Sequence, residues 1–271
     1  MTRLLSIEYF KLRHSKYFWV LMVLFLIFLL AVPFGSKVFI DYLGSMGESI
    51  AGGINIGTLP IFDFVDIWQN LVYIYRLFSI FLGFIVVISI SNEFSYGTIK
   101  QNVIDGLSRR EFWLTKITFI VANAAIVSLC ALLVGLIMGF VWSPVTDFEF
   151  IIKNIEFIAA YFLHLIGFQL FCLTIALLIK RSGITIALMI FYIYVIEPIL
   201  TAILEYEYKL TTLANLFPVR AIGNIIPNPF PKYILRETQT FIGTTDTLIL
   251  CGYILVFLFL SYRMLTKRDL R

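Results

Sequence analysis

Six long apolar runs alternate with polar segments along this 271-residue chain. A helix needs about 20 apolar residues to cross about 30 Å of hydrocarbon, and backbone groups in lipid must be bonded within their own segment. The predicted spans are 17–32, which can extend past Pro33 to Ile40, then 72–91, 117–142, 157–179, 184–204 and 246–264. The pattern therefore predicts an all-α integral membrane protein with six transmembrane helices in a single domain, 1–271.

Composition supports this prediction and limits the classes of molecule that the chain is expected to bind. Apolar residues make up 60% of the chain and charged residues 14%, whereas a soluble domain carries about 25% charged residues. The net charge of +4 does not indicate nucleic-acid binding, because the basic residues lie in short blocks at the ends of the apolar runs. We expect lipid around the chain and no nucleic-acid partner.

Those basic blocks also predict the orientation. If the six spans alternate, 14 of the 21 lysines and arginines fall on one side of the membrane. They are Arg3, Lys11, Arg13, Lys16, Lys100, Arg109, Arg110, Lys116, Lys180, Arg181, Arg263, Lys267, Arg268 and Arg271. Positive residues are in excess in the cytoplasm, so both termini are predicted to be cytoplasmic.

Few residues suggest catalysis or cofactor binding. Cys130, Cys172 and Cys251 lie in apolar runs without a CxxC spacing, which favours small packing residues. The only histidines are His14 and His164, and the sequence has neither an H-E-x-x-H motif nor a phosphate-binding G-x-x-x-x-G-K-[ST] loop. We predict no catalytic residue, no metal site and no cofactor bound by this chain, and consider a membrane enzyme the least favoured class.

The most distinctive polar segment is 92–116, between the second and third spans. Gly97 and Gly106 punctuate it, and 98–104 can form two helical turns with Thr98 as N-cap. Ile99 and Val103 then share a face. Further on, the run from Ser108 to Glu111 has the form of a capping box and marks the next helix. The pattern predicts a short cytoplasmic helix suited to passing force to a soluble partner; the alternative is a basic loop that serves only topology.

With these residues in view, the chain resembles the permeases of type-2 ABC exporters. In that family a Glu closes the second helix, Gly-Thr begins a coupling helix, and Ser-Arg and a Lys open the third helix. The matching residues are Glu93, Gly97, Thr98, Ser108, Arg109 and Lys116, and Glu8, Lys11 and Arg13 before Trp19 are similar to the family's interfacial helix, here expected over 1–16. The resemblance covers the whole chain in length and helix number.

The resemblance implies a transport subunit that works with other chains. The coupling helix would dock on a separate ABC ATPase, present in two copies, which would bind the ATP and Mg²⁺. The coupling residues implied are Glu93, Gly97, Thr98, Ile99, Lys100, Val103, Arg109 and Lys116. A second permease subunit, identical or related, would complete the path for an amphiphile such as a peptide, an antibiotic or a lipid, in the cytoplasmic membrane of a prokaryote.

Polar residues inside the spans are candidates for the translocation path. Glu197, followed by Pro198, lies in the fifth span, and His164 and Gln169 lie in the fourth. A charge at mid-membrane costs about 2.5–3.5 kcal/mol on insertion scales, so such residues face protein or water. We expect His164 and Glu197 to lie within reach of each other; a purely structural bond is the alternative. Arg76 is interpreted as snorkelling to the outer interface.

Two further classes of function stay open. A secondary transporter would use an intramembrane carboxylate, and Glu197 before Pro198 is one such feature, although we find no internal repeat. A membrane scaffold or sensor that uses the same ATPase coupling without transport is the other. The GxxxG from Gly135 to Gly139 allows close helix approach, and we favour packing within the subunit over a dimer contact.

Overall fold

The computed structural model of the chain describes residues 10–11, 13–47, 49–50, 54–55, 59–104, 106, 108–235 and 241–267. Its elements, in chain order, are α2 (Lys16–Ser45), β1 (Ser49–Ile50), β2 (Ile54–Asn55), α3 (Phe64–Ser95), α4 (Thr98–Ile104), α5 (Arg109–Trp142), α6 (Phe148–Ile152), α7 (Glu156–Ile179), α8 (Ser182–Phe191), the π-helix η2 (Tyr192–Ile196), α9 (Glu197–Tyr206), α10 (Thr211–Ala214), α11 (Pro218–Asn224), α12 (Pro231–Leu235) and α13 (Thr244–Lys267).

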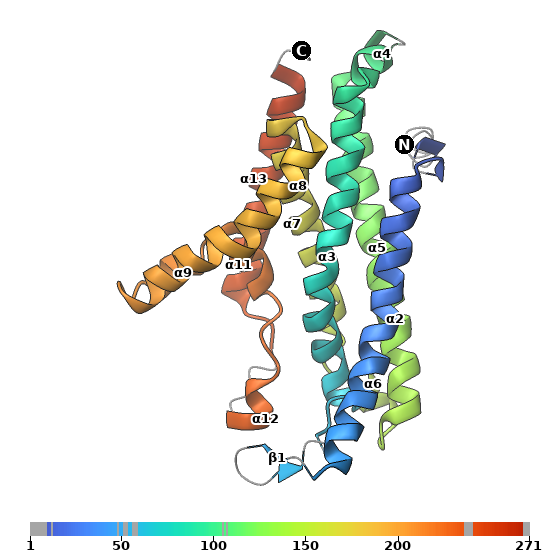
Figure 1. Cartoon of the computed structure of the whole chain (residues 1–271), viewed down its shortest axis with the longest axis vertical. Helices are drawn as coiled ribbons and strands as arrows, with labels where there is room; N and C mark the ends of the chain where they lie inside the picture. The colour runs from blue at the N-terminus through green and yellow to red at the C-terminus, as the bar shows by residue number, and fades with distance from the viewer. Residues whose placement is uncertain are drawn as a thin grey trace.

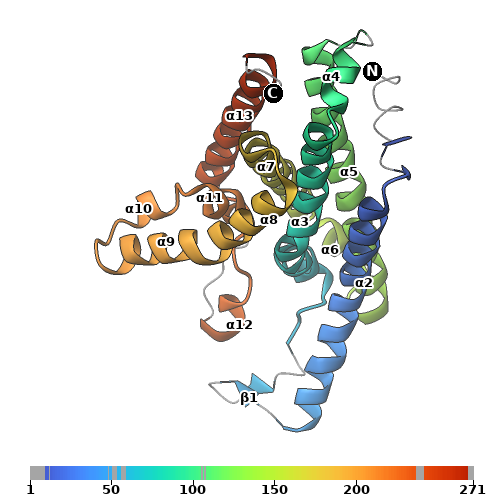
Figure 2. The same cartoon turned by 45° about the horizontal axis from the view of Figure 1, so that its top comes forward.

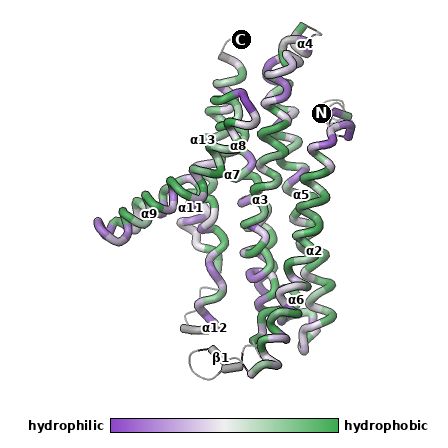
Figure 3. The backbone as a smooth tube through the Cα atoms, in the orientation of Figure 1, coloured by the Kyte–Doolittle hydropathy of each residue, from purple (hydrophilic) through white to green (hydrophobic). Residues whose placement is uncertain are grey.

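The six predicted spans are confirmed as six helical stretches that are long and apolar enough to cross a membrane. The start of α2, the end of α13 and α4 lie at one end of the bundle, here called the terminal end, whereas β1 and α12 lie at the opposite end (Figure 1). Hydrophobic residues run along the long helices, and hydrophilic residues gather near the terminal end and at the tip of α9 (Figure 3). Within the described residues, β1 and β2 form the only sheet, an antiparallel pair with Ser49 opposite Asn55.

Helix α7 is the centre of the bundle. It packs against α3, α5, α8, α11 and α13, and its span is the most enclosed of the six. A helix surrounded on all sides can carry polar residues only if they find partners inside the protein. Gln169 on α7 is fully buried, and its side-chain oxygen accepts a hydrogen bond from Asn123 Nδ2 on α5 at 3.0 Å. This pair therefore joins two helices across the core.

Helix α2 contains Pro33, which has no N–H to bond with the carbonyl of Leu29 one turn earlier. The vacated carbonyl is buried in the bundle. It accepts a hydrogen bond of 2.7 Å from the hydroxyl of Tyr75 on α3, and Tyr75 itself is 1% exposed. A residue on the neighbouring helix thus replaces the backbone bond that the proline removes.

Helices α3 and α5 approach closely at the GxxxG. A Cβ on Gly135 would meet the ring of Trp68, and one on Gly139 would meet the ring of Phe64. Both aromatic rings come from α3 of the same chain. The predicted role of these glycines in packing within the subunit is therefore confirmed.

The fifth span is irregular and leaves the bundle. It consists of α8, η2 and α9, and α9 runs obliquely away from the other helices (Figures 1 and 2). In η2 the N–H of Glu197 bonds to the carbonyl of Tyr192, five residues earlier. Pro198 is the residue that follows, and because it lacks an N–H it fits the first turn of the new helix α9. The fifth span therefore passes through a π-turn just before Pro198 and continues as a second helical segment.

Candidate functional site

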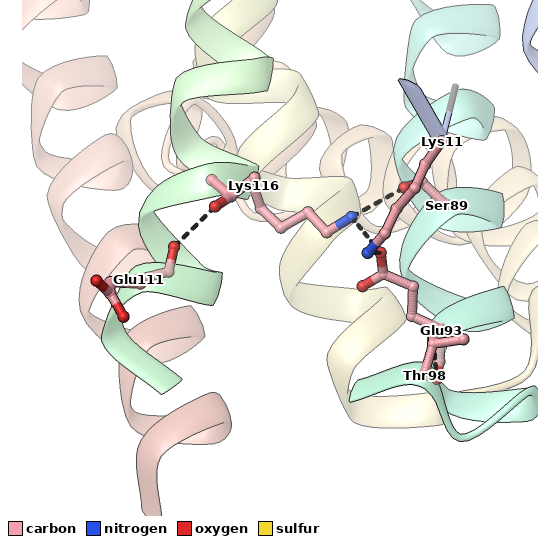
Figure 4. A network of polar contacts seen from close by, with 7 residues as sticks. Lys11, Ser89, Glu93, Thr98, Glu111 and Lys116 are labelled. Atoms are coloured by element: carbon pink, nitrogen blue, oxygen red, sulfur yellow. Dashed lines mark hydrogen bonds and ion pairs between the residues drawn. The ribbon is translucent and has the colours of Figure 1, made fainter. Parts of the chain in front are cut away.

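The first polar cluster lies at the terminal end, where α3 ends and α5 begins. Glu93 Oε1 accepts hydrogen bonds from Lys116 Nζ at 3.0 Å and from Lys11 Nζ at 3.2 Å (Figure 4). Lys116 also donates to Ser89 Oγ at 3.1 Å. Glu93 and Lys116 are 7% and 3% exposed, whereas Lys11 is half-exposed. Because a buried charge is tolerated only when it is paired, these contacts fix the ends of α3 and α5 against each other.

The short helix predicted between the glycines is present as α4. Gly97 has φ +65°, a conformation that glycine adopts without strain, and it turns the chain away from α3. Thr98 Oγ1 donates to the carbonyl of Glu93 at 3.3 Å, which ties the start of α4 to the last turn of α3. The polar cluster and α4 are therefore directly connected.

The faces of α4 differ from the prediction. Ile99 is only 3% exposed and packs into the core, whereas Ile104 is 83% exposed and Tyr96, just before α4, is 76% exposed. Ile99 therefore does not belong to an outward docking face. The side chains of Lys100 and Val103, which the sequence also proposed for coupling, lie outside the described residues. Periodicity alone placed Ile99 on one face of the helix without saying whether that face points inward.

Arg109 connects the same loop to the last helix. Its Nη1 donates to the carbonyl of Thr266 at 3.0 Å, near the end of α13, where a positive charge also complements the helix dipole. The predicted capping box is confirmed, since Ser108 and Glu111 bond reciprocally at the start of α5. One turn further, Trp113 Nε1 donates to Ser261 Oγ on α13 at 3.0 Å. The start of α5 is thus bonded to α3 on one side and to α13 on the other.

A second polar cluster surrounds the short helix α11. Both oxygens of Glu197 accept backbone N–H groups from its first turn, Oε1 from Arg220 at 2.6 Å and Oε2 from Val219 at 3.2 Å. Because the first N–H groups of a helix have no partner within it, a carboxylate at this point both bonds them and complements the helix dipole. Glu197 is 3% exposed, so its charge is held inside the protein.

The other end of α11 is held by cationic and imidazole donors. Arg76 Nη1 donates to the carbonyls of Gly223 at 2.6 Å and Ile226 at 2.9 Å. His164 Nδ1 donates to the carbonyl of Ile222 at 2.9 Å. Each charge sits at the end of α11 whose dipole has the opposite sign. Side chains from α3, α7 and α9 thus hold α11 at both of its ends.

These residues border a cavity of about 310 Å³ between α3, α7, the fifth span and α11. Its lining combines polar and apolar side chains, namely Arg76, Leu77, Ser79, Ile80, His164, Phe168, Ile193, Tyr194, Glu197, Pro198, Thr201, Val219, Arg220, Gly223 and Asn224. We refer to it as the α11 cavity. It lies within the size range of small-molecule sites in proteins.

The sequence-predicted path residues have different positions around this cavity. His164 and Glu197 both line it, and each bonds to the backbone of α11. Gln169 does not line it and instead bonds to Asn123. Arg76 was interpreted as snorkelling, yet it lines the cavity and bonds to α11. A sequence signal for these bonds is Pro218. It marks the start of a helix in an apolar loop, and the first N–H groups of that helix need an acceptor.

A third cluster closes the opposite end of the bundle, at the start of α3. Lys232 Nζ lies 2.8 Å from Asp66 Oδ1, and the Tyr233 hydroxyl donates to Asp66 Oδ2 at 3.3 Å. Burial and the nearby Asp66 carboxylate raise the pKa of the Tyr233 phenol. Among the described residues, no group of three His, Cys, Asp or Glu side chains is arranged to hold a metal ion. We therefore interpret this cluster as a structural fastening of α12.

Comparison with known proteins gives one family. A family model described as "ABC-2 family transporter protein" matches residues 4–198. The matched region contains the Glu93 cluster, α4 and the start of α9, but ends before α11. No curated protein matches the chain.

Proposed function

The chain belongs to the ABC-2 transporter family, and from this premise we propose that it is the permease subunit of an ATP-driven exporter whose ATPase is a separate chain. Membership of the family makes it a multi-pass membrane transport subunit rather than a catalytic enzyme. In the proposed complex two copies of the ATPase bind the ATP and Mg²⁺. A second permease subunit, identical or related, pairs with this one.

We propose that the terminal end faces the cytoplasm, in the cytoplasmic membrane of a prokaryote. The positive residues concentrated on that side support this orientation. It would place α4 where a soluble ATPase can reach it. It would also place the α11 cavity away from the ATPase, on the side toward which a substrate is exported.

The observation that carries the proposal is the exposed end of α4. This helix projects at the terminal end of the bundle (Figure 1), and Ile104 and Tyr96 are among the most exposed large apolar side chains of the described protein. Apolar side chains exposed together on a projecting element are typical of a surface that binds another protein. We assign ATPase docking to Tyr96, Gln101 and Ile104, called the α4 face.

The contacts behind the α4 face support force transmission into the membrane. Thr98 bonds to the last turn of α3, and Glu93 in that turn pairs with Lys116 on α5. Arg109, which follows α4, bonds to the end of α13. A displacement of α4 by the ATPase would therefore reach three spans through short polar contacts.

The path for the substrate is proposed to include the α11 cavity, with His164 and Glu197 in its lining. An amphiphile such as a peptide, an antibiotic or a lipid fits a cavity that has polar groups at α11 and apolar side chains elsewhere. The second permease would cover apolar surface that this subunit leaves exposed. The fifth span and α2 are the least buried of the six.

Co-purification in mild detergent tests the proposal. We expect the full chain to bring down a stoichiometric ATPase, and Ile104→Asp to lose it, because a charge would replace an apolar contact at the α4 face. Arg110→Ala is the control, since Arg110 is exposed in the first turn of α5, just after α4, but lies outside the α4 face. Purification of the wild-type chain without any ATPase would overturn the proposal. Retention of the ATPase by Ile104→Asp would overturn the assigned face.

A further inference from the structure

The α11 cavity is lined by three charged side chains, Glu197, Arg76 and Arg220, and Arg220 is already paired with Glu205 at 2.9 Å. The other two differ in how they are satisfied. Glu197 is 3% exposed, and both of its oxygens accept backbone N–H groups at the positive end of α11. Two such charge-assisted bonds compensate a carboxylate well. Because this carboxylate is also shielded, it offers little attraction to a positively charged ligand.

Arg76 is the remaining charge. It is half-buried, and its hydrogen bonds to Gly223 and Ile226 both use Nη1 and reach neutral carbonyls. The ring of Tyr73 lies beside the guanidinium, with its centre 4.1 Å from Cζ. Within the described part of the chain, no acidic side chain lies within ion-pair distance of Arg76. The charge that a ligand would meet in the cavity is therefore positive.

The rest of the lining suits an apolar chain with a polar head. Leu77, Ile80 and Tyr194 form one part of the wall, and Leu77 and Tyr194 are 56% and 55% exposed on the surface of the spans. Asn224 adds a side-chain amide near the end of α11. A cavity open at an apolar surface, with a cation inside, matches an amphiphile whose head is anionic.

We propose that the α11 cavity binds the carboxylate or phosphate head of an amphiphile at Arg76, with the apolar chain along Leu77, Ile80 and Tyr194. A guanidinium recognises both heads through paired N–H donors. If the proposed function holds, this head defines the class of substrate. The binding itself does not depend on the ATPase.

Photolabelling tests the site with three probes that share one diazirine-bearing dodecyl chain and differ in the head. The heads are a carboxylate, a phosphate and a trimethylammonium. The full chain, with any partner that co-purifies, is placed in phosphatidylcholine nanodiscs, and labelled peptides are mapped. We expect the two anionic probes to label peptides of the α11 cavity about tenfold more than the cationic probe, as one charge-assisted contact implies.

Three variants distinguish recognition of the anionic head by Arg76 from the structural role of Arg76 in holding α11. Arg76→Gln should lower anionic labelling about tenfold, whereas Glu197→Gln should not lower it. Ile80→Trp fills the cavity while it keeps Arg76, and should also remove the label; hydrogen exchange of α11 checks that the helix is still in place. Equal labelling by the cationic probe, or wild-type labelling of either Arg76→Gln or Ile80→Trp, would overturn the proposal.

The same assay distinguishes the source of the ligand. Loss of anionic label on adding ATP and Mg²⁺ identifies transported cargo, and displacement by phosphatidylglycerol without an effect of ATP identifies a bound lipid. Both outcomes support the anionic head. If no ATPase co-purifies, the proposed function fails, but the labelling still tests the site.

Discussion

At the terminal end Glu93 pairs with two lysine side chains, whereas at the α11 cavity both oxygens of Glu197 accept backbone N–H groups from another part of the chain. In the first arrangement the buried pair of Glu93 and Lys116 joins residues of α3 and α5 that lie close in sequence, because one short loop connects the two helices, whereas Lys11 comes from the segment before α2. The second arrangement joins Glu197 in the fifth span to α11, a short helix that begins 21 residues after Glu197, in the segment that follows this span.

This difference indicates that the two polar clusters have different roles. Charges paired with charges hold helix ends in a fixed relation, which suits the transmission of force. Charges paired with a helix dipole hold the short helix α11 in place, and Arg76, one of these charges, also lines the cavity. The following substitutions test whether the two clusters differ in this way.

The largest effect is expected for Glu93→Ala. This change removes the carboxylate to which the buried Lys116 donates, and breaking a buried pair costs about 3–5 kcal/mol. We expect a fall of that size in the free energy of unfolding, measured by SDS denaturation. Adding Lys116→Met should recover most of it, because both charges are then gone. A fall below about 1 kcal/mol would mean that the cluster behaves like an exposed pair.

A smaller and local effect is expected for Glu197→Ala. Two N–H groups of α11 lose their acceptor, and a buried donor left unsatisfied costs about 1–3 kcal/mol. Hydrogen exchange at residues 219 and 220 should accelerate, while global unfolding changes less than in Glu93→Ala. Glu205→Ala is the control, because Glu205 contacts the side chain of Arg220 in a partly exposed pair. Equal effects at Glu197 and Glu205 would contradict the role of the backbone bonds.

The smallest effect is expected for Lys11→Met. The side chain of Lys11 is 34% exposed, and Lys116 still neutralises Glu93 when it is absent. Exposed pairs contribute about 0.2–1 kcal/mol, so the free energy of unfolding should fall by no more than this in the SDS assay. A larger loss would show that the segment containing Lys11 supports the bundle as strongly as α5 does.

The sequence predicted the spans well but placed the start of one of them too late. Helix α3 begins at Phe64, eight residues before the predicted start at 72, whereas α5 begins at Arg109, where the capping box marks it. An apolar run defines only the part of a helix that faces lipid. Gln69 and Asn70 in the early part of α3 are polar and buried, so hydropathy could not include them.

The candidate site was predictable where its partners are near in sequence. Glu93, Thr98, Ser108 and Lys116 lie within one loop and its flanking turns, so a motif with fixed spacing captures them. The second polar cluster, which surrounds α11, joins residues 76, 164, 197 and 220 from four elements, and only the packed structure brings them together. For the same reason, the spacing of apolar residues could not show that Ile99 faces the core.

The hydroxyl of Tyr75 on the carbonyl of Leu29 has a consequence for biogenesis. While α2 is alone in the bilayer, the carbonyl that Pro33 leaves without a partner faces hydrocarbon, which costs free energy. The partner arrives only when α3 has been synthesised and inserted beside it. The first two spans are therefore best released from the insertion machinery as a pair, with Tyr75 completing α2 as they enter the lipid together.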